Sequence, residues 1–483
     1  MAAASSLELS IALDPHAAEP LHRQLQNAIR THIRAGQLIE GARMPSSRRL
    51  ADDLGVSRRM VVDAYEQLVA EGYLTARQGS GTRVARTDRP LATPPRSPTC
   101  ESRPTSPRYD FRPGIPELAA FPRVAWGRAL RRQLRTVPTA DLHYPHPQGH
   151  RLLREALAGY LGRVREARTD AAHLLICSGF TQALTLLCQA LRRAGATRIA
   201  MEDPGLHSVP IIVRAQGLHP VPIPVDQDGI DVNALTSTAA DAVVVTPAHQ
   251  FPTGVVLAPH RREALLRWAR EGHLVIEDDY DAEFRYDRFP VGALQGLAPE
   301  HVILAGTTSK TLCAAMRLGW LALPSSLVTP ITESKQLADH GCAVLDQLAL
   351  ADFLTTAEYD RHIRAMRGRY RNRRDALTQA LHQHAPDLRL AGASAGLHLL
   401  AELPPERHEG AVLQAAARDH LYLDGLARYR HNPDTGRHGL VLGYGNLATT
   451  AVDDGARLIA RALTGATAGS RARGRGARPM ADG

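Results

Sequence analysis

Six short apolar runs alternate with stretches of helical periodicity between residues 173 and 324 of the 483-residue chain, and the runs end in small or acidic residues. In chain order they read HLLICSG, RIAMED, DAVVVTP, HLVIEDD, HVILAGT and LGWLALP. This alternation predicts an α/β fold with a mostly parallel sheet. Ligands of such sheets gather at the carboxyl ends of the strands, so we expect the functional residues directly after these runs.

Two breaks in composition divide the chain. Residues 87–108 read TDRPLATPPRSPTCESRPTSPR, and this Pro-, Ser- and Thr-rich segment predicts an extended linker. From residue 466 the chain combines Gly, Ala and Arg without hydrophobic periodicity, which predicts a disordered tail over residues 466–483. We therefore expect a small module over residues 17–86 and a large module over residues 109–465.

Composition argues against several classes of protein. No apolar run approaches the roughly 20 residues that span a bilayer. The first ten residues lack the pattern of a signal peptide, so we expect a cytoplasmic protein without a membrane segment. The five cysteines form no CxxC pair and no ligand-like spacing with histidine, which argues against a disulfide framework or a metal site. The net charge of +9 permits binding to DNA but does not identify a partner.

The small module has the pattern of a helix-turn-helix. Apolar residues at helical spacing predict a first helix over residues 21–33. Ser46 or Ser47 then caps a short helix, a glycine ends it, and Ser57 caps a further helix over residues 58–71. Helix, three-residue turn and helix is the sequence form of this motif.

The exposed residues of the small module favour contact with DNA. The apolar stripe of its last helix leaves Arg58, Arg59 and Met60 at the exposed N-terminal end, where a recognition helix meets the major groove. The hairpin LTARQGSGTRVA follows, with an arginine on each side of its Gly-rich tip, and this shape suits a phosphate backbone or a minor groove. The alternative is a three-helix bundle whose arginines are only solvated.

Polar residues follow three of the predicted strands in the large module. SGFTQAL follows the first run and opens a helix whose first amides form an anion site. Asp278 and Asp279 end the fourth run, and the fifth leads into GTTSKTL, which contains Lys310 and precedes Arg317. Pyridoxal phosphate needs a primary amine for its Schiff base, an acid for its pyridine nitrogen and donors for its phosphate. These groups therefore predict a site for that cofactor.

Lysine is scarce in this chain, which draws attention to Lys310. Only Lys310 and Lys335 are lysines among 58 basic residues. Arginine does not lose its proton at accessible pH and forms no ordinary Schiff base, whereas a desolvated lysine does. The alternative is that lysine is retained there by chance, as Lys335 illustrates.

The order of features in the small module, MPSSRRLADDLGVSRRMVVDAYEQLVAEGYLTARQGSGTRVA, resembles the winged helix-turn-helix of GntR-family transcription regulators. The resemblance implies contacts with double-stranded DNA from Arg43, Ser46, Ser47, Arg48, Arg58, Arg59, Met60, Gln78, Gly79 and Gly81. The first four match phosphate and groove contacts, the next three meet bases, and the last three form the tip of the wing. Met60 stands where the family usually has Thr, which implies a different base preference, toward a thymine methyl group.

Residues 144–324 resemble fold-type I aminotransferases, with a smaller C-terminal subdomain. The resemblance is strongest to the MocR/GabR subfamily of GntR regulators, which joins a winged helix to an aminotransferase-like domain. The motifs that carry the resemblance are HQFPTG, EDDYDAEFRYD and GTTSKTLCAAMRLGW. It implies pyridoxal 5'-phosphate bound to Lys310, with Tyr280 at the 3-oxygen of the cofactor. It implies Asp278, or as a second choice Asp279, beside the pyridine nitrogen.

The same resemblance implies a phosphate cup and a homodimer. The residues that match the cup are Ser178, Gly179, Phe180, Thr181, Thr307, Ser309 and Arg317. Tyr144 matches a tyrosine that aminotransferases donate to the phosphate across the dimer interface.

Three positions depart from the aminotransferase pattern. Leu206 stands where an aromatic residue usually stacks on the cofactor, and Phe251 replaces a polar contact for which His249 or Gln250 is the substitute. Val441 stands where an arginine normally binds the carboxylate of the substrate. Three arginines lie close enough in sequence to replace it: Arg428, Arg430 and Arg437.

These observations favour a transcription regulator whose aminotransferase-like domain senses a small amine, an amino acid or a B6 vitamer. We expect it to act as a homodimer on an operator with two half-sites. The alternative is a working aminotransferase with a DNA-binding module for autoregulation, and a third hypothesis is a scaffold without cofactor. The missing carboxylate arginine favours sensing, because transamination needs the substrate held in a fixed orientation.

Overall fold

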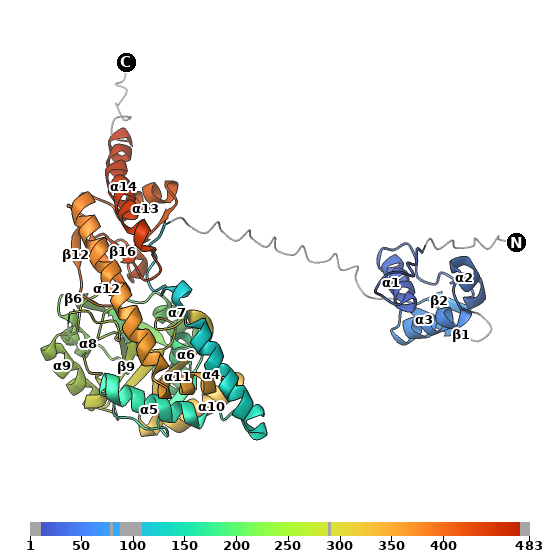
Figure 1. The fold of residues 1–483 in the computed structure, drawn as a ribbon, viewed down its shortest axis with the longest axis horizontal. Helices are drawn as coiled ribbons and strands as arrows, with labels where there is room; N and C mark the ends of the chain where they lie inside the picture. Colours follow the sequence, from blue (N-terminus) through green and yellow to red (C-terminus); the bar gives the residue numbers. More distant parts are fainter. Residues whose placement is uncertain (1–10, 78–80, 87–108, 288–290, 474–483) are drawn as a thin grey trace, which may run out of the picture. The chain divides into compact units, whose positions relative to one another are not determined.

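The computed structural model describes residues 11–77, 81–86, 109–287 and 291–473, which belong to two compact units (Figure 1). One unit lies within residues 1–105 and the other within residues 106–483. The predicted linker over residues 87–108 and the predicted wing-tip residues Gln78 and Gly79 lie outside the described residues.

The small unit contains three helices and a hairpin. Its elements are α1 (Leu21–Arg34), α2 (Ser47–Leu54), α3 (Arg58–Ala70), β1 (Leu74–Arg77) and β2 (Gly81–Val84). Ser46, rather than Ser47, caps α2, because its side chain accepts a hydrogen bond from the amide of Arg49 at 3.3 Å. Ser57 caps α3 in the same way, by accepting from the amide of Met60 at 3.2 Å.

The core of the small unit forms where helical spacing predicts it. Val61, Ala64, Tyr65 and Leu68 of α3 are buried, and they pack with apolar residues of α1 and α2. The backbone ahead of α2 extends the hairpin, because the amide of Met44 donates to the carbonyl oxygen of Thr82 at 2.9 Å. Three backbone segments therefore form the wing side of this unit.

The large unit is built on an eight-stranded sheet with the order β4-β11-β10-β9-β8-β5-β6-β7. The strands are β4 (Leu174–Cys177), β5 (Arg198–Asp203), β6 (His219–Asp226), β7 (Gly229–Ile230), β8 (Ala242–Val245), β9 (Leu274–Asp279), β10 (Val302–Thr307) and β11 (Gly319–Ala322). Only β7 and β11 run against the others. The six predicted strands are present, and the prediction of an α/β fold with a mostly parallel sheet is confirmed.

The strand β6 is missing from the sequence prediction, because its run HPVPIPVD carries a proline at every second position. Proline lacks the amide that a ladder needs and is normally excluded from strand interiors. Residues 219–224 keep a full register with β5, whereas β7 pairs only with Val225 and Asp226. Pro220, Pro222 and Pro224 all share the side of the strand that faces away from β5, where proline leaves no amide to donate, and the Pro224 carbonyl oxygen accepts from the amide of Asp231 at 2.8 Å.

Helices cover both faces of the large sheet. One face packs with α6 (Phe180–Arg193), α7 (Ser208–Ala215) and α10 (Ser325–Asp339). The other face packs with α4 (Arg123–Thr136), α5 (Arg151–Arg165), α8 (Val232–Thr236), α9 (Pro259–Arg270) and α11 (Val344–Thr355). Burial on both faces explains why the strands read as continuous apolar runs.

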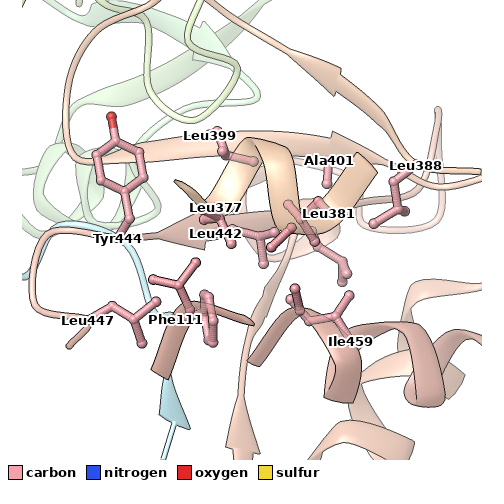
Figure 2. Packing of buried hydrophobic residues seen from close by; sticks show 14 of the residues in the cluster. Phe111, Leu377, Leu381, Leu388, Leu399, Ala401, Leu442, Tyr444, Leu447 and Ile459 are labelled. Atoms are coloured by element: carbon pink, nitrogen blue, oxygen red, sulfur yellow. The ribbon is translucent and has the colours of Figure 1, made fainter. Parts of the chain in front are cut away.

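A smaller C-terminal lobe follows the large sheet. Its antiparallel sheet has the order β12-β13-β16-β15, formed by β12 (Arg389–Ala391), β13 (His398–Glu402), β15 (Asp424–Gly425) and β16 (Gly439–Gly443). The helices α12 (Glu358–His384), α13 (Glu409–Arg418) and α14 (Val452–Arg473) pack with it. Figure 2 shows Leu377 and Leu381 of α12 between Leu399 and Leu442 of the sheet and Ile459 of α14. In Figure 1, α12 runs from this lobe down to α11, so it connects the lobe to the main sheet.

The chain enters the large unit through this C-terminal lobe. The strand β3 (Tyr109–Asp110) pairs in parallel with β14 (Leu421–Tyr422). Phe111 is fully buried in the core of the lobe (Figure 2). The segment that follows the predicted linker is therefore a structural part of the C-terminal lobe.

The helix α14 continues to Arg473, beyond the boundary that composition predicts at residue 465. The residues after 465 include Ala466, Ala468 and Arg471, and both residue types have high helix propensity. Because these residues lack apolar periodicity, a search for amphipathic segments does not predict this part of the helix. The rest of the predicted tail, residues 474–483, lies outside the described residues.

Candidate functional site

A cavity of about 480 Å³ lies at the carboxyl ends of the central strands. Residues at or just after the ends of β9 and β10 line one side, together with the start of α6. The segment 112–115 and parts of the C-terminal lobe complete the wall. The cavity therefore lies where an open α/β sheet usually binds its ligand.

Lys310 lies in the wall of this cavity. Its Nζ donates a hydrogen bond to the carbonyl oxygen of Gly114 at 2.6 Å. Burial lowers the pKa of Lys310, although the carboxylates of Asp281 and Asp278 oppose that shift. A lowered pKa increases the fraction of neutral amine, which is the form that attacks a carbonyl carbon.

Asp278 and Asp279 follow one another on β9 but have different surroundings. Asp279 forms a buried ion pair with Arg165, with Oδ2 2.7 Å from the guanidinium Nε. Asp278 lines the cavity, and its buried Oδ1 has no hydrogen-bond partner among the described residues. The geometry therefore favours Asp278 over Asp279 as the acid that faces a ligand.

The isolation of Asp278 is a test of whether the residues fit pyridoxal phosphate. Burial, with Asp279 as the next cause, raises the pKa of Asp278 well above its usual range. A protonated pyridine nitrogen would supply both the missing hydrogen-bond donor and the missing positive charge. The unpaired acid therefore fits that cofactor.

Tyr280 and His249 lie on the same side of the cavity. The Tyr280 hydroxyl donates to the carbonyl oxygen of His249 at 3.0 Å and lies 3.1 Å from His249 Nδ1. The same Nδ1 lies 3.0 Å from Oδ2 of Asp281, and both side chains are buried. His249 is not part of the cavity wall, and it contacts Tyr280, which is.

The opposite end of the cavity has the features of an anion site. Gly179, with φ of +97°, precedes α6, and Phe180 and Thr181 present the first turn of that helix to the cavity. Thr307, Ser309 and Arg317 also line the wall, and the Thr307 hydroxyl donates to Oγ of Ser309 at 2.9 Å. Free amides at a helix N-terminus and an arginine suit a phosphate group.

Gly179 lies beside Arg317, and its φ of +97° is a backbone conformation that residues with a side chain rarely adopt. A Cβ atom on Gly179 would lie 3.5 Å from the Arg317 guanidinium. No hydrogen bond or ion pair of the Arg317 side chain is found within the described residues. This guanidinium is thus available to an anion in the cavity.

Ser178 and Tyr144 do not line the cavity. The amide of Ser178 donates to Oε1 of Gln182 at 2.8 Å, and its hydroxyl lies 3.7 Å from Cys342 Sγ. Tyr144 is 78% exposed on the surface of the large unit, where a second copy of the chain could reach it. The other predicted cofactor residues line the cavity, except Gly179, which adjoins Arg317 just before α6, and the indirectly placed His249.

Two of the three positions that depart from the aminotransferase pattern line the cavity. Leu206 and Phe251 line it, and the ring of Phe251 contacts the edge of Tyr429 with centroids 5.0 Å apart. Val441 is fully buried in β16. Of the three candidate arginines, only Arg428 lines this cavity, and it pairs with Asp424 at 3.5 Å.

The other two arginines are engaged elsewhere. Arg430 donates to the backbone carbonyls of Thr435 and Arg437. Arg437 itself is 77% exposed and lies 3.5 Å from Glu402.

Sequence reasoning missed the contribution of the segment 112–115 and of His398. Gly114 has φ of +80°, and a Cβ atom there would lie 3.0 Å from Lys310 Nζ. His398 lines the cavity from β13 and is buried against Phe251, with ring centroids 5.1 Å apart. The one local signal is the Pro-Gly pair at residues 113–114, which marks a turn without indicating its partner.

Glu202 lies behind the cavity, and its carboxyl group allows a test of how burial shifts a pKa in this region. Burial raises the pKa of Glu202 to about 7, although Thr246 and Gln250 donate hydrogen bonds to the carboxyl group. An acid whose pKa is raised by folding keeps its proton longer in the folded state. It therefore lowers stability as the pH rises from about 4.5 to about 7.

We predict that Glu202→Gln has little effect on stability at pH 5 and raises the free energy of unfolding at pH 8 by roughly 2–3 kcal/mol. Urea denaturation of the full chain at the two pH values measures this difference. Burial also raises the pKa of Glu277 to about 7, so the variant should retain part of the pH dependence. An equal change at both pH values would contradict the shifted pKa of Glu202.

The predicted DNA contacts lie together on the surface of the small unit. Arg43, Ser46, Arg48, Arg58 and Arg59 are exposed, whereas Ser47 and Met60 are half-buried and Gly81 is exposed on the wing. Nε of Arg58 lies 3.5 Å from Oγ of Ser47, which places the start of α3 beside the start of α2. A Cβ atom on Gly81 would lie 3.5 Å from the Arg43 guanidinium, so the wing adjoins the same surface.

Comparison with known proteins agrees with both units. The model of the family described as bacterial regulatory proteins, gntR family, matches residues 21–84, and that of aminotransferase class I and II matches residues 124–437. The chain is 32% identical over 471 residues to the probable rhizopine catabolism regulatory protein MocR of Rhizobium meliloti, covering 92% of this chain and 94% of that protein. It is 33% identical over 443 residues to the pyridoxine biosynthesis transcriptional regulator PdxR of Corynebacterium glutamicum, covering 91% and 95%.

The fold also matches a solved structure. The kynurenine aminotransferase of Pyrococcus horikoshii superimposes with a TM-score of 0.68 at 24% identity, over 74% of this chain and 91% of that one. At this identity the match shows the fold alone.

A winged helix joined to an aminotransferase fold defines a class of transcription regulators. The chain belongs to this family, in which a gntR-type DNA-binding domain precedes a domain of aminotransferase class I and II. It is therefore a DNA-binding regulator whose large unit is of the type that binds pyridoxal phosphate. None of the helices in the described ranges combines the length and the apolar character needed to cross a bilayer.

Proposed function

We propose that this regulator controls transcription in response to a small amine, an amino acid or a B6 vitamer that reaches Lys310. The observation that carries the proposal is the arrangement of one cavity. A lysine with a lowered pKa, an acid whose buried Oδ1 has no hydrogen-bond partner in the described part of the chain, and the start of a helix all face the same space. These three groups match the reactive carbonyl, the ring nitrogen and the phosphate of pyridoxal phosphate.

Each group has a defined task toward the cofactor, which supplies a carbonyl carbon that reacts with primary amines. Lys310 holds the cofactor covalently, and Asp278 accepts a hydrogen bond from the protonated ring nitrogen. Tyr280, held by His249, binds the 3-oxygen. The phosphate is bound by the amides after Gly179 and by the remaining cup residues, Thr181, Thr307, Ser309 and Arg317.

Sensing is favoured over turnover by the carboxylate side of the cavity. Val441 carries no charge and does not line the cavity, and Arg428, the one of the three candidate arginines that lines it, already pairs with Asp424. An amino-acid effector must compete with Asp424 for this guanidinium, so its carboxylate is held weakly. When the bond to be broken is poorly oriented, the rate of transamination falls more than the affinity for the amino acid does.

We further propose a homodimer that binds an operator with two half-sites. Tyr144 supports this arrangement, because it is exposed and belongs to a segment that packs beside the phosphate end of the cavity. In a dimer it would reach the phosphate in the partner subunit. Two winged helices per dimer then require two half-sites at a fixed spacing.

The proposal is tested by a titration of amines and B6 vitamers, read from the visible absorption of the protein-bound cofactor. The titration is repeated with the DNA that the protein protects upstream of its own gene. A true effector should shift the spectrum at lower concentration when it favours the DNA-bound state, or at higher concentration when it opposes that state. The ratio of the effector dissociation constants measured with and without operator DNA must equal the ratio of the operator dissociation constants measured with and without the effector, because linkage is reciprocal.

Two results would contradict the proposal. The first is an effector affinity that is the same with and without operator DNA for every compound that shifts the spectrum. The second is rapid multiple turnover of an amino donor and a keto acceptor, which would favour the aminotransferase hypothesis instead.

A further inference from the structure

The second lysine of the chain lies in a polar cluster behind the phosphate end of the cavity. Lys335, on α10, is fully buried, and its Nζ lies 2.5 Å from Oδ1 and 2.7 Å from Oδ2 of Asp339. Burying an ammonium group is costly, and an apolar side chain usually packs there at lower cost. Its presence at this position therefore calls for a role beyond filling the core.

Asp339 uses all four of its acceptor positions. Oδ1 accepts from Lys335 and from the amide of Gly341 at 2.9 Å. Oδ2 accepts from Lys335 and from Nε2 of Gln182 at 2.7 Å. A carboxylate with every acceptor position filled has one orientation. Lys335 thereby fixes the carboxylate that binds the other two groups.

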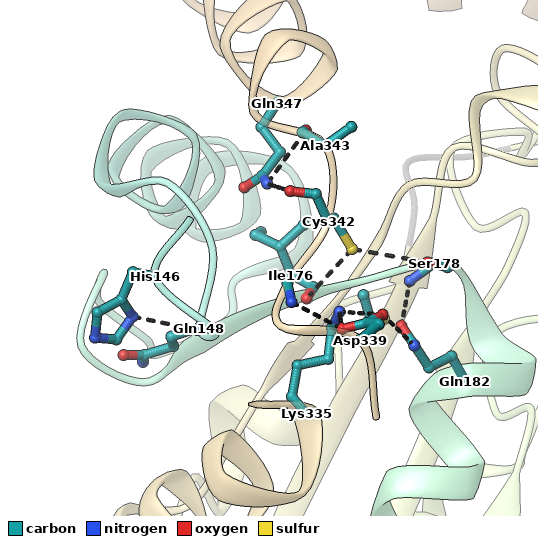
Figure 3. Close-up of polar contacts among 12 residues, drawn as sticks. His146, Gln148, Ile176, Ser178, Gln182, Lys335, Asp339, Cys342, Ala343 and Gln347 are labelled. Carbon is teal, nitrogen blue, oxygen red and sulfur yellow. Dashed lines mark hydrogen bonds and ion pairs between the residues drawn. The ribbon is translucent and has the colours of Figure 1, made fainter. Parts of the chain in front are cut away.

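Gln182 carries this constraint to the phosphate cup. Its Nε2 must donate to Asp339, so its Oε1 faces the amide of Ser178 and accepts from it at 2.8 Å (Figure 3). That hydrogen bond holds the residue just before Gly179, where the backbone turns into α6. The orientation of this turn determines where the amides of Phe180 and Thr181 point.

The other branch of the cluster leads to the surface that carries Tyr144. The amide of Gly341 is held by Asp339, and a Cβ atom on Gly341 would lie 2.9 Å from Cγ of Pro145. The ring of the neighbouring His340 lies 5.8 Å from that of Tyr144. The ion pair of the buried Lys335 with the partly exposed Asp339 thus adjoins both the cup of its own chain and the tyrosine proposed to reach the cup of a second copy.

We propose that Lys335 is a positioning residue for the cofactor phosphate, acting through Asp339 and Gln182 on the turn at Ser178 and Gly179. This inference rests on the proposed function, since it requires that the cavity binds a phosphorylated pyridoxal. Lysine suits the position because its compact ammonium group binds both carboxylate oxygens from within the same helix turn. The wide guanidinium of arginine needs a planar, bidentate approach.

The test compares the binding of pyridoxal phosphate and of pyridoxal, which lacks the phosphate, to the full-length protein. Free pyridoxal forms an internal hemiacetal that the phosphorylated compound cannot form, but this cost is the same for every variant. The change in the ratio of the two dissociation constants between variants therefore reports the cup. The variants are Lys335→Met and Gln182→Met, and the matched control is Gln189→Met. Gln189 is on the same helix, where its side chain binds Gln216 at 3.1 Å, away from the cup.

We expect both Lys335→Met and Gln182→Met to lower the preference for the phosphorylated compound by about tenfold, the scale of a lost hydrogen bond to a charged group. Gln189→Met should leave it unchanged. A lower melting temperature for Lys335→Met, with an unchanged preference in both variants, would overturn the proposal and leave a structural ion pair only. If Lys335→Met does not fold, Gln182→Met decides the question. A wild-type protein that binds neither compound would overturn the proposed function, and this inference with it.

Discussion

Replacing Lys310 with arginine is expected to abolish covalent attachment of pyridoxal phosphate. Arginine keeps the positive charge but does not release its proton at accessible pH, so it forms no Schiff base. The visible absorption band of the wild-type protein should disappear, and borohydride should no longer fix the cofactor to the chain. Lys310→Ala should give the same result without the added bulk. Because the cavity also holds the phosphate and the ring, non-covalent binding should survive in weakened form.

The composition of the chain gives this experiment an internal control. Lys335 is the only other lysine, and it is fully buried in an ion pair with Asp339. After borohydride reduction of the wild-type protein, mass spectrometry should find the cofactor on the peptide with Lys310 and none on the peptide with Lys335. Label on Lys335, or a visible band that persists in Lys310→Arg, would contradict the assignment of Lys310.

The second large effect is expected at the start of α3. The double variant Arg58→Ala and Arg59→Ala should lower affinity for the operator by roughly a hundredfold or more, because each contact with a base edge contributes about 1–3 kcal/mol. Both side chains are exposed, and neither takes part in the core of the small unit, so the fold should be unaffected. Fluorescence anisotropy with operator DNA and with a scrambled duplex of equal length measures the effect.

Arg34 offers a single-charge control for this variant, which itself loses two positive charges. It lies at the end of α1, it is exposed, and its guanidinium donates to the hydroxyl of Tyr73 at 2.6 Å. Arg34→Ala removes one positive charge from the same unit without changing the predicted DNA contacts. Equal losses for operator and scrambled DNA in the double variant would indicate phosphate contacts rather than base readout.

Much of the fold follows from local patterns in the sequence. The apolar runs predict six strands of the main sheet because a strand buried on both faces needs no polar residues. The caps of α2 and α3 follow from single serines, whose side chains bind amides only three residues away. Such short-range interactions are visible in any window of sequence.

What the sequence did not reveal depends on contacts between distant segments. The choice between Asp278 and Asp279 depends on Arg165, which pairs with Asp279 from the end of α5. The partner of Lys310 is the carbonyl of Gly114, from a segment that precedes the first strand of the main sheet. The amide of Ser178 is taken by Gln182, whose own orientation depends on α10. No local pattern encodes these pairs, because each depends on how separate elements pack.

The short segment from Tyr109 to Gly114 has a consequence for how a signal leaves the cavity. It begins in the pairing of β3 with β14, directly after the predicted linker, and it ends at the carbonyl that holds the amine of Lys310. Along an extended backbone these residues span at most about 17 Å. If Lys310 binds the cofactor covalently as proposed, this carbonyl would lose the amine as its hydrogen-bond donor. The proposed chemistry at Lys310 would therefore change a contact at one end of a short segment whose other end is the strand pair where the chain enters the large unit.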